Sequence, residues 1–374
     1  TGPAAWNGTL VYRFGDGCGA TYGQGRPNVA AVAPDLLAEG YAVATASFTS
    51  GAVLCNDVIA AETVMMVKER VIEELGEPRA TIGQGAGFGA ALLHLVVQDY
   101  PGLVDGAVAL DPQVDIVTAA TGAAECSLLE DYYASVRGGS LTAEQRMAID
   151  GHASPSTCQR WQALGSDLAD PSDGCDPSIA PDRIWSPANA AGVRCDLAGV
   201  NAVQFGVDPA TGLVVRPFDN VGVQYGLEAL NAGTISVEEF LDLNEHIGGL
   251  DADGRPQAAR TAVDPLLVQT FYEQGRVSTG VGDQPKIPIL EIDRWDDPTG
   301  AIGDHLRPFS FRDRLNLNGP VEVSPGLAIW TRPATTATGG TSPVVEGVQV
   351  VDEWLVTLAG DGGGSGGSRA ERLA

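Results

Sequence analysis

The first 112 residues alternate between short, almost continuously apolar runs and segments with helical periodicity. The apolar runs have the length and composition of buried strands, and turn residues such as Gly and Pro separate them from the helical segments. Strands are predicted at 9–14, 41–46, 79–82 and 106–110, and helices at 35–39, 58–75 and 90–99. This alternation is typical of an α/β protein whose mostly parallel sheet is covered by helices on both faces.

The longest of these helices, 58–75, has a pattern that predicts its buried face. Four apolar side chains recur at helical spacing and are expected to point toward the sheet: Val64, Val67, Val71 and Leu75. Gly76 follows them and is expected to end the helix.

The alternation stops near residue 112, and the following sequence is interpreted as a large, mainly helical insertion. Helices are predicted there at 141–149, 159–168 and 236–243, the last with Thr234 or Ser236 as its cap. The sheet then resumes at 286–292, with a last strand at 327–330 and a closing helix at 348–358. The predicted parts are two core segments, 1–112 and 281–358, the insertion 113–280 and a Gly- and Ser-rich flexible tail, 359–374.

Composition narrows the range of functions. The chain has 374 residues, with 22 Lys plus Arg against 48 Asp plus Glu, which gives a formal net charge of −26. So acidic a protein repels phosphate backbones and anionic membranes, and neither nucleic acid nor membrane is expected as a partner. Hydrophobic residues make up 44% of the chain, enough for a folded core. No apolar run is long enough to span a bilayer.

Six cysteines are spread through Gly- and Pro-rich sequence, none of them in a CxxC pair: Cys18, Cys55, Cys126, Cys158, Cys175 and Cys195. An even number favours three disulfides and a secreted or periplasmic protein. One arrangement closes a local loop with Cys158–Cys175 and joins strand ends with Cys18–Cys55, leaving Cys126 to Cys195. Free buried thiols are the alternative. The chain begins at Thr1 without a signal-peptide pattern, which we interpret as a mature or trimmed product.

The strongest local signal is the stretch 81–90, TIGQGAGFGA, where a strand runs into a turn of small residues and then into a helix. A strained strand–turn–helix of this kind carries the nucleophile in hydrolases, and the residues two before and two after its centre must be small. Two registers satisfy this demand, with the centre at Gly87 or at Gly85. Neither centre is Ser, Cys or Asp, so the elbow is predicted without its nucleophile.

A dinucleotide-binding loop is an alternative interpretation of the same glycines. Starting at Gly85, the spacing ends in Ala90, a variant that the dinucleotide fingerprint allows. The motif follows the third predicted strand rather than the first, and Asp111 comes later than the expected acidic residue. No metal or cofactor is predicted, since cysteine metal spacing is absent and a calcium loop ending at Glu239 lacks two of its oxygen ligands.

The order of these parts resembles the α/β-hydrolase superfamily, in particular secreted bacterial esterase-like proteins of the tannase and feruloyl-esterase group. The resemblance covers about 8–112 and 285–335 and implies that 113–280 form a lid over a substrate pocket. Gly15, Asp16 and Gly17 lie where such proteins carry an oxyanion loop with exposed amides. Ala86 and Phe88, beside the centre of the elbow, are expected to share the oxyanion and substrate-binding role.

The resemblance also indicates where an acid and a base would lie. Asp296 or Asp297 is the expected acid, with Asp111 as another candidate; these carboxylates could instead cap a turn. The family's base follows the last strand, where this chain has no histidine, so His305 is the candidate. The other three histidines are interpreted as structural: His94, His152 and His246.

Three hypotheses for the function follow. The first is a secreted carboxylic-ester hydrolase scaffold that acts on small-molecule or polymeric esters and whose nucleophile position is Gly. The second is a non-catalytic protein of the same fold that binds a ligand. The third is a dinucleotide-binding enzyme. The oligomeric state is not predicted.

Overall fold

The computed structural model describes residues 6–23, 28–135, 138–172, 174–209, 211–318, 326–333 and 342–360. Its central feature is a six-stranded sheet within these ranges, in the order β2-β1-β3-β4-β7-β8, with every neighbouring pair parallel. The strands are β1 Thr9–Phe14, β2 Ala42–Ala44, β3 Ala80–Ala86, β4 Gly106–Leu110, β7 Ile289–Trp295 and β8 Leu327–Pro333. The parallel α/β sheet predicted from the sequence is confirmed.

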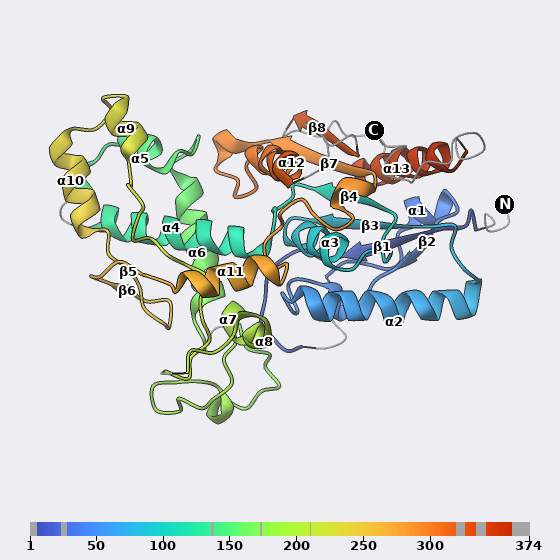
Figure 1. Ribbon diagram of the computed structural model, residues 1–374, viewed down its shortest axis with the longest axis horizontal. Helices are drawn as coiled ribbons and strands as arrows, with labels where there is room; N and C mark the ends of the chain where they lie inside the picture. Colours follow the sequence, from blue (N-terminus) through green and yellow to red (C-terminus); the bar gives the residue numbers. More distant parts are fainter. Residues whose placement is uncertain are drawn as a thin grey trace. The chain divides into compact units, whose positions relative to one another are not determined.

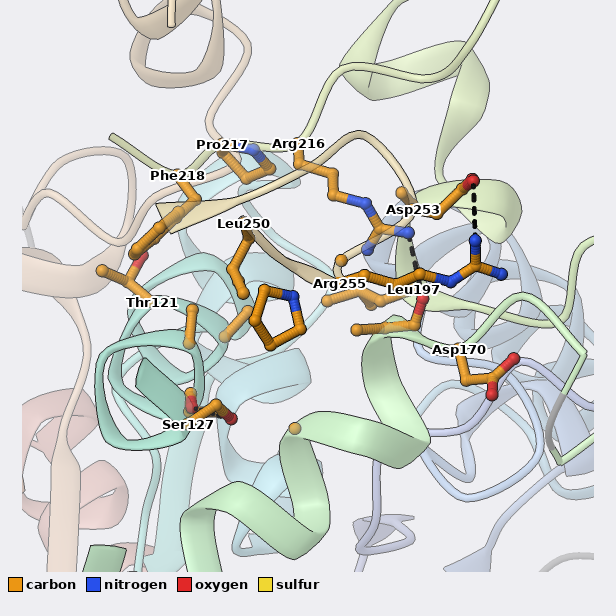
Figure 2. A pocket seen from close by; sticks show the side chains of 18 of the residues that line it. Thr121, Ser127, Asp170, Leu197, Arg216, Pro217, Phe218, Leu250, Asp253 and Arg255 are labelled. Atoms are coloured by element: carbon orange, nitrogen blue, oxygen red, sulfur yellow. Dashed lines mark hydrogen bonds and ion pairs between the residues drawn. The ribbon is translucent and has the colours of Figure 1, made fainter. Parts of the chain in front are cut away.

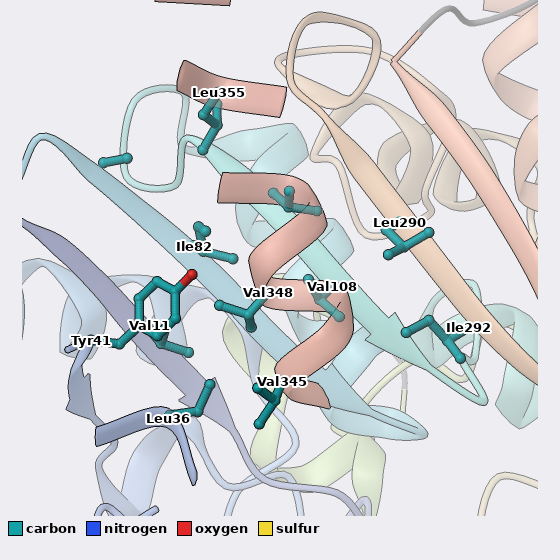
Figure 3. Packing of buried hydrophobic residues seen from close by; sticks show 12 residues of the cluster. Val11, Leu36, Tyr41, Ile82, Val108, Leu290, Ile292, Val345, Val348 and Leu355 are labelled. Carbon is teal, nitrogen blue, oxygen red and sulfur yellow. The ribbon is translucent and has the colours of Figure 1, made fainter. Parts of the chain in front are cut away.

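Helices cover both faces of this sheet (Figure 1). They are α1 Pro34–Ala38, α2 Asp57–Leu75, α3 Phe88–Asp99, α12 Leu306–Asn318 and α13 Pro343–Gly360. Figure 3 shows α13 laying Val345, Val348 and Leu355 on one face, against strand residues such as Ile82 and Val108. The next residue along β3, Gly83, faces the other way, because a Cβ there would meet Leu93 of α3. Strand β3 therefore contributes to both hydrophobic layers, the one between the sheet and α13 and the one between the sheet and α3.

Two details of this core differ from the sequence-based expectation. Strand β3 continues to Ala86, four residues past its predicted end, because Gly85 and Ala86 keep pairing with β4 despite their low strand propensity. Helix α2 buries Asp57, Ala60, Ala61 and Val64 rather than the stripe that continues to Leu75, which is 54% exposed. Only the first half of α2 lies against the core. The spacing of apolar residues in its second half therefore does not predict which of them are buried.

The chain forms two compact units. One contains the sheet; the other consists of residues 117–274 together with 296–304. Segment 296–304, which the sequence analysis assigned to the core, thus packs with the insertion. The helices of the insertion are α4 Ile116–Ala134, α5 Ala143–Asp150, α6 Ser156–Ala169, α7 Leu197–Val200, α8 Ala202–Phe205, α9 Leu227–Asn231, α10 Val237–His246 and α11 Pro265–Glu273, with a short hairpin of β5 Gly249–Leu250 and β6 Pro256–Gln257.

Local sequence explains where some of these helices begin. Ser236 accepts a hydrogen bond from the Glu239 backbone N–H at 3.1 Å, and the Glu239 carboxylate accepts one from Ser236 N–H at 2.7 Å. This reciprocal cap identifies Ser236, one of the two predicted caps, as the start of α10. The expected tail is described only as far as Gly360, the end of α13, and its remainder lies outside the described residues. No helix of the described ranges is long and apolar enough to cross a bilayer.

Three disulfides link all six cysteines. Cys18–Cys55 is the predicted pair. The other two are Cys126–Cys158 and Cys175–Cys195, so the expected pairs Cys158–Cys175 and Cys126–Cys195 are wrong. The physical reason is that Cys126 lies on α4 and Cys158 on α6, two helices that come together in the insertion, and this brings their Cα atoms to 4.8 Å. Proximity along the chain was a poor guide to proximity between these helices.

A buried arginine between two carboxylates ties the ends of α2 and α3 to the segment before β7. Arg276 is 6% exposed and contacts Asp57, while its Nη2 lies 3.3 Å from Asp99 Oδ2. Burial raises the pKa of the Asp99 carboxyl to about 6, even though Gln98 and Arg276 act to lower it. Burial also raises the pKa of Asp57. The folded protein therefore holds a proton on Asp99 at pH values where the unfolded chain releases it.

We predict that Asp99→Asn flattens the dependence of stability on pH. A carboxyl whose pKa is raised in the folded state stabilises the fold at low pH, and this contribution is lost as the pH rises through about 6. The wild-type free energy of unfolding should fall by up to about 3 kcal/mol more than that of the variant between pH 4 and 7. Urea unfolding across this range measures the difference. The exposed Asp313→Asn serves as control, and equal slopes for Asp99→Asn and wild type would contradict the prediction.

Candidate active site

The stretch 81–90 forms a sharp strand–turn–helix at the carboxyl end of the central strand. β3 ends at Ala86, Gly87 has φ 53° and ψ −117°, and α3 starts at Phe88. A positive φ of this kind is unfavourable for residues with a side chain. Gly87, rather than Gly85, is therefore the centre of the turn.

The glycines on either side of this centre allow a close backbone approach. A Cβ on Gly85 would lie 2.5 Å from the Gly89 carbonyl oxygen, and a Cβ on Gly89 would lie 2.8 Å from the carbonyl oxygens of Phe14 and Gly15. Real Cβ contacts are longer than this, so both positions require glycine. The pattern of small residues thus packs β3 and α3 against the end of β1.

The carboxylate of Asp16 occupies the space above Gly87. Asp16 Oδ1 accepts hydrogen bonds from the backbone N–H of Gly17 at 2.6 Å and of Phe88 at 2.8 Å. A Cβ on Gly87 would lie 2.7 Å from Asp16 Cγ and 2.9 Å from Oδ2, and closer still to Oδ1. A residue with a side chain at position 87 would therefore clash with the Asp16 carboxylate.

Two amide donors that converge on one oxygen are the arrangement that stabilises an oxyanion in acyl transfer. Here one amide comes from the loop after β1 and the other from the first residue of α3, whose N-terminus adds a favourable dipole for negative charge. The N–H of Gly15, which the sequence analysis placed in the same loop, instead donates to Thr49 O at 2.9 Å. Ala86 remains the last residue of β3.

The candidate acids belong to two different units, Asp111 to the sheet unit and the other two to the insertion. Asp111 directly follows β4, has φ 42° and accepts hydrogen bonds from Arg294 N–H and Nε at 3.1 and 2.8 Å. Asp296 and Asp297 lie in the second compact unit, in the turn at Asp297–Thr299. The Asp296 carbonyl oxygen accepts from Thr299 N–H and Oγ1, and Asp297 is 7% exposed.

The candidate base, His305, precedes α12. Its ring lies edge-on to Trp295, with centroids 4.3 Å apart, and 6.3 Å from the ring of Phe309. His94, on α3, is fully buried: Nδ1 lies 3.2 Å from Val114 O, Nε2 lies 3.0 Å from Glu291 Oε1, and its ring stacks on Phe311. His94 therefore serves packing inside the sheet unit.

One cluster has the composition of a metal site. Cys126, Cys158 and His152 offer ligand atoms within 4.8 Å of one another. Both sulfurs form the Cys126–Cys158 disulfide, which leaves no thiolate to bind a cation. The arrangement is accounted for by the disulfide.

The role of the Asp16 side chain was missed by sequence reasoning, which assigned only the backbone amides of that loop. The available signal was the combination of a glycine at the centre of the elbow with a carboxylate in the facing loop. Asp16 and Phe88 are 72 residues apart, so only the pairing of β1 with β3 brings them together.

The sheet order, the elbow after the central strand and the flanking helices define an α/β-hydrolase fold. The chain belongs to the tannase-like family of unknown function (DUF6351), which matches residues 1–371. The family match supports an ester-hydrolase scaffold. A comparison with curated proteins finds no match.

Among solved structures, similarity is found to an esterase from Aspergillus oryzae, at 13% identity and TM-score 0.43, covering 95% of this chain and 76% of that one. Feruloyl esterase B from the same organism gives 15% identity and TM-score 0.44, covering 94% and 77%. Est1E from Butyrivibrio proteoclasticus gives 13% identity and TM-score 0.35, covering 93% and 87%.

We predict that Gly87→Ala destabilises the protein through Asp16. Gly102→Ala is the matched control, because Gly102 also has a positive φ but its Cβ would meet no atom within 4 Å. The control should cost about 1 to 2 kcal/mol of backbone strain. Gly87→Ala should cost about 1 to 3 kcal/mol more, because the new methyl group displaces the carboxylate from both amides.

The test is a double-mutant cycle with Asp16→Ala, followed by urea unfolding. In the Asp16→Ala background the cost of Gly87→Ala should fall to that of Gly102→Ala. An unchanged cost in that background would mean that Asp16 does not constrain position 87.

Proposed function

We propose that this chain is a ligand-binding member of its family that does not hydrolyse esters through an acyl-enzyme. The observation that carries the proposal is the Asp16 carboxylate, which accepts hydrogen bonds from both Gly17 and Phe88 N–H above a glycine. A negative oxygen of the protein lies where the negative oxygen of a tetrahedral intermediate would have to form. The two charges would repel each other, and the amides cannot serve both.

The other parts of an acyl-transfer mechanism support the same conclusion. Acyl transfer needs a nucleophile, a base within hydrogen-bond reach and an oxyanion site. Position 87 is Gly, and no histidine follows β8 in the sequence. The ligands of such a protein would be small-molecule or polymeric esters, or the related acids, held without turnover.

Dinucleotide binding is less well supported by the same geometry. A pyrophosphate binds the N-terminus of the helix that follows a glycine-rich turn. At α3 this position holds the Asp16 carboxylate, whose oxygen accepts the Phe88 N–H. A second anion would have to displace it.

The cellular location is part of the proposal. Three disulfides in one chain favour an oxidising compartment, and we infer a secreted or periplasmic protein. The net charge of −26 adds to the solubility of such a protein.

We predict that wild-type protein and Gly87→Ser both fail to turn over p-nitrophenyl acetate above the rate in buffer. In Gly87→Ser the Asp16 carboxylate competes for the amides that an intermediate requires. The double variant Asp16→Ala/Gly87→Ser frees both amides and adds a nucleophile. With imidazole added as an external base to take the proton of the serine hydroxyl, the double variant should become acetylated at position 87 as p-nitrophenolate leaves, whereas Gly87→Ser should not. Intact-protein and peptide mass spectrometry measure the adduct, with Asp16→Ala alone as control.

Saturable turnover by the wild type that disappears in Asp16→Ala would overturn the proposal, because the carboxylate would then be a catalytic group. A folded double variant that forms no adduct with imidazole present would contradict the proposal that the two amides form an oxyanion site.

A further inference from the structure

The insertion contains a cavity of its own, of about 300 Å³ (Figure 2). All of the side chains that line it belong to the second compact unit. They come from α4, α6, α7 and α8, from Asp170 directly after α6, from the loop 216–218 and from the β5–β6 hairpin, 250–256. The volume lies at the lower end of the range for sites that bind small molecules, about 300 to 1,000 Å³.

Small side chains on two helices create this space. Ala120, Ala123 and Ala124 on α4 line one side, and Gly165 and Ala169 on α6 line another. Alanines at these helical spacings lie on one face of α4. Larger residues at these positions would fill the cavity.

Rings and aliphatic side chains enclose the remainder. Phe205, Phe218, Leu250 and Pro256 line the cavity. The Phe205 ring packs edge-on against Phe271, with centroids 5.1 Å apart, which fixes its orientation. Figure 2 shows Phe218 and Leu250 toward one end, with Thr121 near Phe218 and Ser127 further away. This end suits an apolar group, and most strongly a flat ring that can lie on the alanine surface.

At the opposite end, the charged side chains already have hydrogen-bond or ion-pair partners within the protein. Arg216 donates to Asp196 at 2.7 Å and to the carbonyl oxygens of Ala169 and Ala252 at 3.0 and 2.9 Å. Asp253 accepts from Arg194 at 2.9 Å. In Figure 2 Arg255 also points to Asp253, and its Nη1 lies 3.9 Å from Asp253 Oδ2.

Asp170, at the same end, accepts hydrogen bonds from Ser172 N–H and Oγ at 2.8 and 2.7 Å. An anionic ligand would have to displace a carboxylate from Arg216 or Arg255, and a cationic ligand would have to displace the donors that hold Asp253 and Asp170; both are unfavourable.

We propose that this cavity binds an uncharged, largely apolar ring compound with a hydrogen-bonding group at one end. The ring would lie on the alanine surface of α4 against Phe218 and Leu250, and its polar group would reach the ion-paired end. The site is separate from the elbow, since no residue of the sheet unit lines it. The proposal therefore does not depend on the function proposed for the elbow.

Three probes with the same ring test the charge preference: 2-naphthylmethanol, 2-naphthoate and 2-naphthylmethylammonium. Isothermal titration calorimetry on the full chain at pH 7.5 should give saturable binding of the alcohol, at least about tenfold tighter than either charged analogue. Tightest binding by the ammonium would overturn the proposal in favour of attraction by acidic residues such as Asp131. Tightest binding by the carboxylate would instead indicate an anion site at the arginines.

Cavity-filling variants test the place of binding. Ala124→Leu and, separately, Ala120→Leu should weaken binding of the alcohol at least about tenfold, because the leucine occupies the site of the ring. Ala134→Leu, an exposed position on the same helix outside the cavity, is the control and should leave the affinity unchanged.

Near-ultraviolet circular dichroism verifies that each variant is folded, and two independent positions guard against failure of one of them. Asp16→Ala should also bind normally. Equal affinity in wild type and in both folded cavity variants would overturn the assignment of the site.

Discussion

The hydrogen bonds from Gly17 and Phe88 N–H to the exposed Asp16 carboxylate are the interaction on which the arrangement of the elbow depends. They join the end of β1 to the start of α3 directly above the turn at Gly87. The carboxylate needs a position without a Cβ beneath it, and the turn needs a residue that tolerates φ 53°. Glycine satisfies both demands at once. An anion of the protein thereby compensates amides that a hydrolase would leave open for its substrate.

The sequence predicts the parallel sheet well because each strand is a short apolar run bounded by turn residues. Its central turn could be located for a related reason. A Cβ at Gly85 or Gly89 would lie less than 3 Å from neighbouring backbone atoms, and this requirement for glycine leaves a clear sequence pattern. The same argument holds for Ser236, whose capping role depends on a residue only three positions away. Features that depend on residues close together in the chain can therefore be predicted from the sequence.

Features that depend on tertiary contacts were not predictable in this way. The pairing of Cys126 with Cys158 follows from how α4 and α6 pack, and neither helix boundary fixes that packing. The buried face of α2 is set by where the helix meets the sheet, so alanines near its start are buried while Leu75 is exposed. The Asp16 carboxylate could be assigned only when the distance across β1 and β3 was known. Its residue type was visible, but the direction of its side chain was not.

The elbow also illustrates why a motif predicts a fold better than an activity. Gly85 and Gly89 are needed wherever a strand turns this sharply into a helix packed on the neighbouring strand, whatever residue lies between them. The chemistry of a hydrolase depends on that central residue and on groups brought from other loops, and none of these is required for the turn. A chain can therefore keep the whole backbone arrangement while its amides bind a carboxylate of its own. In such a protein, cavities that the elbow does not line, such as the cavity of the insertion, are the better guide to what is bound.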